Sequence, residues 1–224
     1  DNMYGSFGVS AYSYTGSWSE SRTPDYFYNA TASKSGSGDY ALASTYYWPG
    51  ASYKMKFFAY APKDNGQYVL SGSTHPGSPT IGVTIPSDVN DQEDLLVAQT
   101  AELAGNTNTA VALTFNHAQD GTVKSVSLKN VYSKGTYNMG TQTWSDVDTP
   151  ADFSQTLDKS TTGTPNEALT TDAQTFMMIP QTLPDGAQIE VVFTDYAGTD
   201  HTLTADIKGT EWPIGKTVTY KISS

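Results

Sequence analysis

The sequence lacks cysteine altogether, and arginine occurs only once, at Arg22. Without cysteine the chain cannot depend on disulfides, so apolar burial and strand pairing must hold it together. A single arginine leaves no basic cluster for phosphate recognition. The 23 acidic residues against 12 basic ones give a net charge of −11, which opposes binding to nucleic acids and to anionic lipid surfaces.

Long apolar runs and helical periodicity are missing as well. No run approaches the roughly 18 apolar residues that a membrane-spanning helix needs, and no sustained 3.6-residue repeat appears. The chain starts at Asp1 without a charged and apolar leader. Its low charge and its wealth of Tyr, Thr, Ser and Gly favour an exported protein over a cytosolic one. We therefore expect the targeting signal to lie outside this sequence.

Short alternating segments fill the chain instead. Fifteen tyrosines and 19 glycines, with many Ser and Thr, suit short strands joined by tight turns. Alternation is clear in residues 53–62, where lysines on one face predict contact with water, and in residues 188–193. The turn 64–66 (Asp-Asn-Gly) predicts a hairpin from 53–62 into 67–70. Residues 146–171 show little periodicity and predict a long loop.

A polar segment, residues 105–109, separates two groups of predicted strands. The 224 residues are enough for one large β-sandwich or two small ones, because domains commonly run to roughly 100–150 residues. We place the boundary at this segment. The sequence then predicts an all-β protein with an N-terminal β-sandwich of residues 1–105 and a C-terminal β-sandwich of residues 106–224.

Seven short motifs occur along the chain in a characteristic order: YYWPG (46–50), KFFAYAP (56–62), DLLVA (94–98), LTFNHA (113–118), KGTYN (134–138), FMMIPQ (176–181) and EWPIGKTVTY (211–220). Each motif alone is weak, but in this order they resemble the Bacteroides-type fimbrillin-like family of surface pilus subunits and their anchors. The resemblance implies two tandem β-sandwich modules of transthyretin-like Greek-key topology.

The resemblance also implies a function and a location. Members are exported as lipoproteins to the outer membrane and assemble into a fimbrium by β-strand addition, which supports cell adhesion. The expected partners are other fimbrial subunits or further copies of this chain, with a membrane contact only through a lipid anchor outside the sequence. Two departures leave a tip, anchor or free surface protein open beside a shaft subunit. Ala118 runs straight into a turn, and the chain stops two residues after Ile222.

Two regions are candidates for assembly. In the last predicted strand, residues 217–222, alternation puts Val218, Tyr220 and Ile222 on the inward face, and an unpaired strand edge can accept a strand from another molecule. The resemblance implies an arginine-directed cut that removes a leading strand, so Arg22 is a candidate processing site. An ordinary loop arginine is the alternative.

Aromatic residues provide an alternative function. Tyr46 and Tyr47 are consecutive and cannot both point into one core, so some aromatic area must meet solvent or another protein layer. Tyr46, Tyr47 and Trp48 are therefore candidate ligand-facing residues that could stack on sugar rings. Ordinary alternation between core and surface is the simpler explanation for them. The alternative is a carbohydrate-binding surface lipoprotein with a host protein or glycan as its partner.

Catalytic and metal signatures are weak. His75, His117 and His201 are far apart, and none has a second histidine at metal-ligand spacing. The acidic stretch 88–94 is rich in oxygen ligands, but Glu93 stands where an EF-hand needs glycine. Neither a G-x-S-x-G motif nor a P-loop is present. The sequence therefore predicts no catalytic residue, no metal, no cofactor and no enzymatic activity.

Overall fold

Strands make up nearly all the regular structure in the computed structural model, which describes residues 4–36, 38–63, 65–100, 105–116, 121–161 and 175–223. Within these ranges the chain is all-β apart from one turn of 3-10 helix, η1 (Val89–Asp91), as the sequence predicts. The chain divides into two units. Unit 1 comprises Asp1–Thr84, Asp94–Thr107 and Gly135–Asp146, and unit 2 comprises Ile85–Glu93, Asn108–Lys134 and Val147–Ser224.

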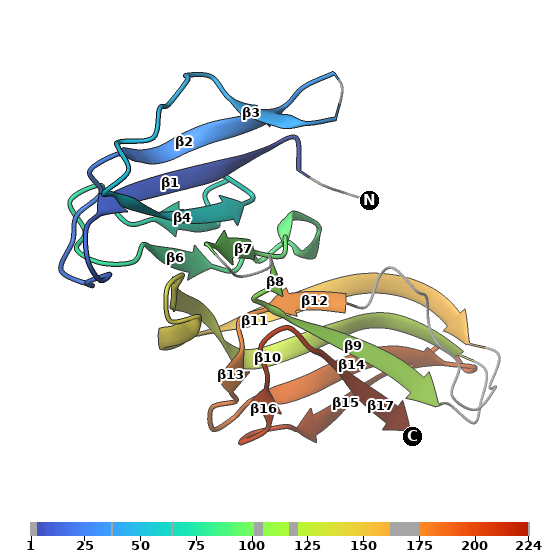
Figure 1. Ribbon diagram of the computed structural model, residues 1–224. Helices are drawn as coiled ribbons and strands as arrows, with labels where there is room; N and C mark the ends of the chain where they lie inside the picture. Colours follow the sequence, from blue (N-terminus) through green and yellow to red (C-terminus); the bar gives the residue numbers. More distant parts are fainter. Residues whose placement is uncertain are drawn as a thin grey trace. The chain divides into compact units, whose positions relative to one another are not determined.

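Unit 1 contains a six-stranded sheet of order β3-β2-β1-β4-β7-β8. The strands are β1 (Ser6–Tyr14), β2 (Phe27–Lys34), β3 (Tyr40–Leu42), β4 (Lys54–Ala61), β7 (Leu96–Gln99) and β8 (Gly105–Asn106). β1 lies between β2 and β4 and pairs antiparallel with both (Figure 1). Ala11 and Tyr12 in β1 are fully buried, one on each face of the strand. Both faces and both edges of β1 are therefore covered.

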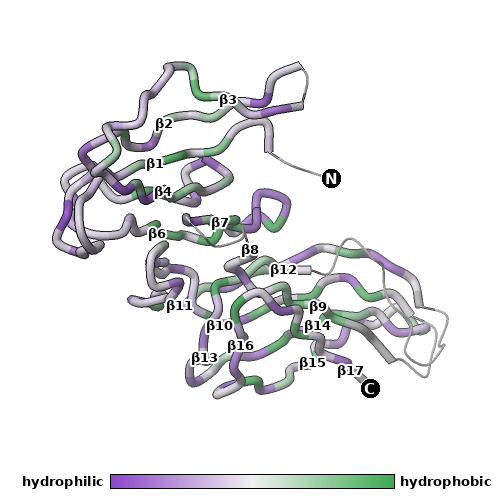
Figure 2. The backbone as a smooth tube through the Cα atoms, in the orientation of Figure 1, coloured by the Kyte–Doolittle hydropathy of each residue, from purple (hydrophilic) through white to green (hydrophobic). Residues whose placement is uncertain are grey.

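The core of unit 1 is rich in aromatic residues. Tyr12 of β1 packs edge-on against Phe58 of β4, with ring centroids 5.7 Å apart. Two further strands, β5 (Tyr68–Leu70) and β6 (Thr80–Thr84), pair antiparallel and add the buried residues Tyr68, Ile81 and Val83. In Figure 2 the green hydrophobic segments gather along strands such as β1 and β4, and the purple ones gather mainly in the connections. Burial of the alternate apolar positions thus explains why these segments form strands.

The predicted hairpin from residues 53–62 into 67–70 is wrong. β4 pairs with β1 and β7, whereas β5 pairs with β6 in a different sheet. The turn at Asn65 and Gly66, where Gly66 has φ of 79°, carries the chain from one sheet to the other. Alternation identifies both strands correctly, but it contains no information about which neighbour each strand takes.

The prediction that the lysine face of β4 meets water is also wrong over most of the strand. Phe58 and Tyr60 lie on the same face as Lys56, and they are among the most buried residues of the unit. Lys56 places its Nζ atom 4.7 Å from the ring centroid of Trp18. A lysine can cover aromatic surface with its stem while its charge sits over a ring, so this residue does not mark a solvated face.

Unit 2 contains three groups of strands. β14 (Gln188–Asp195) pairs with β15 (Asp200–Asp206) and with the first part of β10 (Gly121–Asn138), which also pairs with β11 (Thr143–Thr161). A three-stranded sheet has the order β12-β9-β17, from β12 (Thr175–Met178), β9 (Thr109–Asn116) and β17 (Thr217–Ser223). β13 (Gln181–Thr182) pairs with β16 (Glu211–Trp212). The buried set includes Val111, Leu128, Phe176, Ile189 and Trp212.

Most of the predicted loop at residues 146–171 is strand. β11 continues to Thr161, and its inward positions are Phe153, Gln155 and Leu157, at 1%, 6% and 9% exposure. The buried amide of Gln155 donates to the carbonyl of Thr175 at 3.1 Å. A polar residue in the middle of the inward set hides the alternation from a hydropathy pattern. Residues 162–171 of the predicted loop lie outside the described residues.

The two units do not follow a single cut in the sequence. Ile85–Glu93 belongs to unit 2 although it precedes residue 105, and Gly135–Asp146 belongs to unit 1 although it follows. β10 and β11 each contribute residues to both units. The sequence predicts separately folding domains at residues 1–105 and 106–224 with transthyretin-like Greek-key topology. These domains and this topology stay predictions.

Candidate assembly edge and ligand-contacting surface

β17 is an edge strand. It pairs in parallel with β9, from Thr217 opposite Ala110 to Ser223 opposite Asn116. It occupies the last position in the order β12-β9-β17, so β9 is its one neighbour among the strands that the structure describes. The second side of β17 therefore presents backbone groups that a further strand could pair with.

One hydrogen bond shows which residues face that open side. The N–H of Ala110 donates to the carbonyl of Lys216 at 3.0 Å. In a parallel ladder every second residue directs both backbone groups to its neighbour. With the observed register, those residues are Val218 and Tyr220, so the backbone groups of the alternate residues, Thr217, Thr219 and Lys221, point to the open side.

The structure places two of the three predicted β17 residues on one half-buried face. Val218 and Tyr220 are partly covered, whereas Thr217, Thr219 and Lys221 are exposed. The hydroxyl of Tyr220 accepts a hydrogen bond of 2.9 Å from the indole N–H of Trp212, which is buried in β16. The side chain of Ile222 lies outside the described residues. β17 is thus attached to unit 2 through one ladder and one half-buried face.

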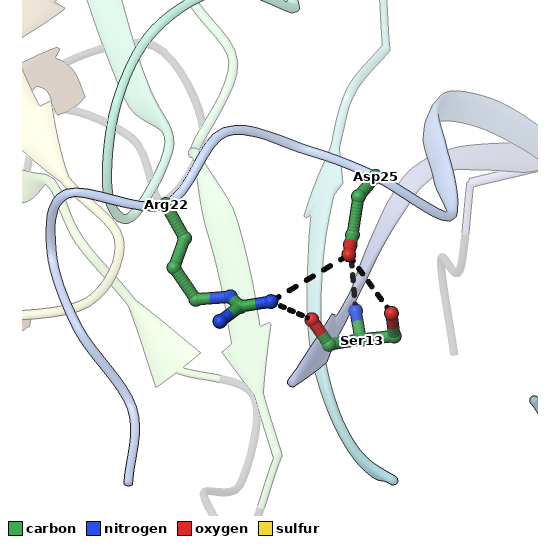
Figure 3. A network of polar contacts seen from close by, with 3 residues as sticks. All are labelled: Ser13, Arg22 and Asp25. Atoms are coloured by element: carbon green, nitrogen blue, oxygen red, sulfur yellow. Dashed lines mark hydrogen bonds and ion pairs between the residues drawn. The ribbon is translucent and has the colours of Figure 1, made fainter. Parts of the chain in front are cut away.

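Arg22 does not behave as a free loop residue (Figure 3). Its Nη2 donates to the carbonyl of Ser13 at 2.7 Å and lies 3.7 Å from Oδ2 of Asp25. Asp25 in turn accepts from both the backbone N–H and the hydroxyl of Ser13, each at 2.8 Å. The carbonyl of Arg22 accepts from the N–H of Gly77 at 2.6 Å. These contacts tie the Arg22 segment to the end of β1, and cleavage there stays a prediction.

Glu20 attaches the same segment to a distant loop. Its carboxylate accepts from the N–H and hydroxyl of Ser78, at 2.6 and 3.0 Å, and from the indole N–H of Trp18 at 2.6 Å. Partial burial raises the pKa of Glu20, but these hydrogen bonds and the charge of Lys56 outweigh it, so the net pKa lies below its usual value. Glu20 and Ser78 are 58 positions apart, and no sequence signal joins them.

Five aromatic residues of unit 1 form a surface that we call the aromatic shelf: Tyr26, Phe27, Tyr46, Tyr47 and Trp48. The Tyr46 ring lies 4.3 Å from Phe27 and 5.9 Å from Tyr26, centroid to centroid. Tyr46, Tyr47 and Trp48 are exposed. The shelf borders a hollow of about 270 Å³. The structure thus joins the three predicted residues to Tyr26 and Phe27, about 20 positions earlier.

Of the three histidines, the structure describes His75 in unit 1 and His201 in unit 2. His201 contacts Asp195 through Nε2 at 2.8 Å and stacks on Phe193, and His117 lies outside the described residues. In the acidic stretch, Asp88 accepts from the N–H of Asn90 and caps η1. Within the described ranges, no group of three or more His, Cys, Asp or Glu residues is placed to hold a metal ion. No helix in these ranges is long and apolar enough to cross a membrane.

The fold defines an all-β protein, and within the described residues β17 lies at the edge of a three-stranded sheet. The chain belongs to the Fimbrillin-like family, which matches residues 3–224. It is 28% identical over 154 residues to the fimbrium subunit Fim1C of Phocaeicola vulgatus. That match covers 61% of this chain and 39% of the relative, so the chain spans about two fifths of it.

A solved structure supports the same fold. The crystal structure of a fimbrial protein from Bacteroides vulgatus superimposes with a TM-score of 0.67 at 19% identity. The match covers 97% of this chain and 88% of that chain. At this identity the likeness concerns the fold alone, and it extends over both units.

Proposed function

We propose that this chain is a non-catalytic fimbrial subunit, or a fimbria-associated protein, that is exported to the cell surface and supports adhesion. Membership of the Fimbrillin-like family over residues 3–224 supports the proposal, as does the likeness to a fimbrium subunit. Its partners are other fimbrial subunits or further copies of the chain. In this proposal a lipid anchor outside the sequence holds it at the outer membrane, and residues 1–105 and 106–224 act as two sandwich modules.

The proposed mechanism is β-strand addition at β17, and the edge position of this strand is the observation that carries it. An incoming strand would pair with the backbone groups of Thr217, Thr219 and Lys221. Main-chain hydrogen bonds would then give a register, and the alternate side chains of the incoming strand would bury apolar area. Lys221 is the one charged residue of this strand, so charge protects this edge only weakly against pairing.

Two proline substitutions test this mechanism because they remove N–H groups that point in opposite directions. Thr219→Pro removes an outward N–H, and proline is tolerated at such positions of edge strands, so we expect the unfolding free energy to change by less than about 1 kcal/mol. Tyr220→Pro removes an N–H that faces β9 and should cost about 3 kcal/mol. Thr219→Val keeps the N–H and is the matched control.

Self-association is measured by analytical ultracentrifugation and electron microscopy over a concentration series. Thr219→Pro should abolish association while the fold persists, and Thr219→Val should associate as the unmodified protein does. If Thr219→Pro associates normally, addition at β17 is wrong. If the unmodified chain stays monomeric at every concentration, addition at β17 between copies of this chain is wrong.

A further inference from the structure

The aromatic shelf lies in unit 1, whereas β17 belongs to unit 2, so the shelf contributes no residue to the proposed edge. Its rings are unusually exposed for large apolar side chains, at 81% for Tyr47 and 61% for Trp48. Tyr53, in the same segment, is also exposed. The other exposed large apolar residues of the described chain are single and far apart in the sequence: Val69, Tyr196 and Ile214. A clustered apolar surface of this kind commonly marks a binding site.

The shelf is held in place before any ligand arrives. The hydroxyl of Tyr26 donates to the carbonyl of Tyr47, and the indole N–H of Trp48 donates to the carbonyl of Tyr53 at 3.4 Å. The N–H of Tyr53 donates to the carbonyl of Gly50, whose φ of 137° suits glycine. The hydroxyl of Tyr26 and the indole N–H of Trp48 are thus bonded within the chain, while the side chains of Tyr47 and Trp48 remain exposed. A ligand would meet pre-ordered apolar faces.

The composition of the hollow indicates a neutral ligand. All ten residues that line it lie in the described part of the chain, and none is charged. The chain as a whole carries a net charge of −11, so the shelf is a neutral area on an acidic protein. Neither an acidic nor a basic peptide finds a counter-charge there. Seven of the ten lining residues are aromatic or proline, which gives flat surfaces.

We propose that the aromatic shelf binds a neutral pyranose unit of a glycan. The face of an aromatic ring carries partial negative charge, and the C–H groups on one face of a pyranose carry partial positive charge, so the two stack. The hollow of about 270 Å³ is slightly smaller than the roughly 300–1,000 Å³ of sites for drug-sized ligands, which suits a single sugar ring. The proposal is independent of how subunits assemble.

Glycan binding is tested on the full chain with immobilised oligosaccharides that end in glucose, galactose or N-acetylglucosamine. Sialylated versions of the same oligosaccharides serve as anionic probes. Tyr47→Ala and Trp48→Ala each remove one exposed ring and should weaken binding to a neutral oligosaccharide by about tenfold. Tyr196→Ala is the matched control, because it removes an equally exposed tyrosine from β-hairpin β14–β15 in unit 2.

The expected result is binding of neutral oligosaccharides that the two shelf variants lose and Tyr196→Ala keeps, with circular dichroism unchanged in all three. Three results would overturn the proposal: no neutral oligosaccharide bound by the unmodified protein, equal loss in Tyr196→Ala, or preference for the sialylated probes. A proline-rich peptide that binds the shelf in place of every sugar would overturn it too, since aromatic grooves also accept such peptides. None of these results bears on Thr219→Pro.

Discussion

The first and last strands of the chain are held in opposite ways. β1 lies between β2 and β4, pairs antiparallel with both, and contains four consecutive buried residues, Ser10 to Ser13. Among the strands that the structure describes, β17 pairs with β9 alone, in parallel, and its alternate residues are exposed. Removal of β1 would break two ladders, those with β2 and β4, whereas removal of β17 would break one, that with β9.

The difference indicates where strand exchange costs least. Opening of a strand breaks its ladders and exposes its apolar face, so an edge strand with a half-buried face opens at a lower free energy than an interior strand. The proposed assembly at β17 needs such an edge, and the integrity of unit 1 needs β1 in place. Substitutions that loosen β1 should therefore lower the stability of the chain more than substitutions in β17.

Tyr12 provides the largest expected effect. Tyr12→Ala removes a fully buried ring between Trp18 and Phe58 and should lower the unfolding free energy by about 3–5 kcal/mol. Tyr12→Phe should leave stability unchanged or raise it. Its buried hydroxyl has no hydrogen-bond partner among the described residues, and an unpaired buried polar group is costly. Denaturant unfolding followed by fluorescence measures both.

The half-buried Val218 of β17 is the control for Tyr12. Val218→Ala should cost about 1 kcal/mol or less, because little area is lost at an edge position. If Val218→Ala lowers the unfolding free energy as much as Tyr12→Ala does, β17 contributes as much stability as β1. The expected difference between the two strands would then be wrong.

Amide hydrogen exchange gives the second largest expected effect. The amide of Tyr220 faces β9 and is protected by a single ladder, whereas Tyr12 sits in an interior strand. We expect the opening free energy at Tyr220 to lie about 2 kcal/mol or more below that at Tyr12. Native-state exchange read by NMR gives both values. Equal protection would show that β17 opens only with global unfolding, which would argue against its role as an accessible edge.

The sequence identified strands more reliably than it identified their neighbours. Alternation located β4 and β14 because their inward residues are apolar. It missed β11, since Gln155 occupies an inward position and satisfies its amide with the carbonyl of Thr175. It also paired β4 with β5 wrongly, because pairing depends on which apolar faces meet in three dimensions.

The candidate sites show the same limit. Simple alternation at Tyr46 and Tyr47 predicts that one ring leaves the core, but it contains no link to Tyr26. The sequence predicts residues 217–222 as a candidate edge strand, whereas the parallel pairing of β17 with β9 comes only from the structure. For Arg22, the hypothesis of an ordinary loop arginine missed its contacts with Ser13 and Asp25. A hydrogen-bond network between a strand end and a loop leaves no periodic pattern in the sequence.

Asp25 tests how the end of β1 is fastened. Asp25→Ala removes the acceptor for the N–H and the hydroxyl of Ser13 and the ion pair with Arg22. The loss should be about 1–2 kcal/mol, since Ser13 is buried and its donors would lack a partner. Asp25→Asn keeps an acceptor oxygen and should cost less. Thermal unfolding of the two variants measures this difference in stability. If Asp25→Ala is as stable as the unmodified chain, the network of Ser13, Arg22 and Asp25 does not stabilise the end of β1.

Glu20 provides the smallest effect and a pH signature. Its pKa in the folded protein lies below the usual value, so its contribution to stability is present above that usual range and is lost as the pH falls through the lowered pKa. Because Glu20 is largely exposed, we expect a contribution below about 1 kcal/mol. The unfolding free energy of the unmodified chain should fall by this contribution between about pH 6 and about pH 3, and Glu20→Gln should lack this part of the decrease.

The control for Glu20 is Glu211→Gln, which removes an exposed carboxylate from β16 in unit 2. As an exposed surface substitution, this variant should leave the unfolding free energy nearly unchanged. If Glu20→Gln keeps the pH profile of the unmodified chain, the hydrogen bonds to Ser78 contribute nothing measurable. The segment from Trp18 to Arg22 would then be fastened by the contacts of Arg22 with Ser13, Asp25 and Gly77 and by the packing of Trp18 on the rings of unit 1.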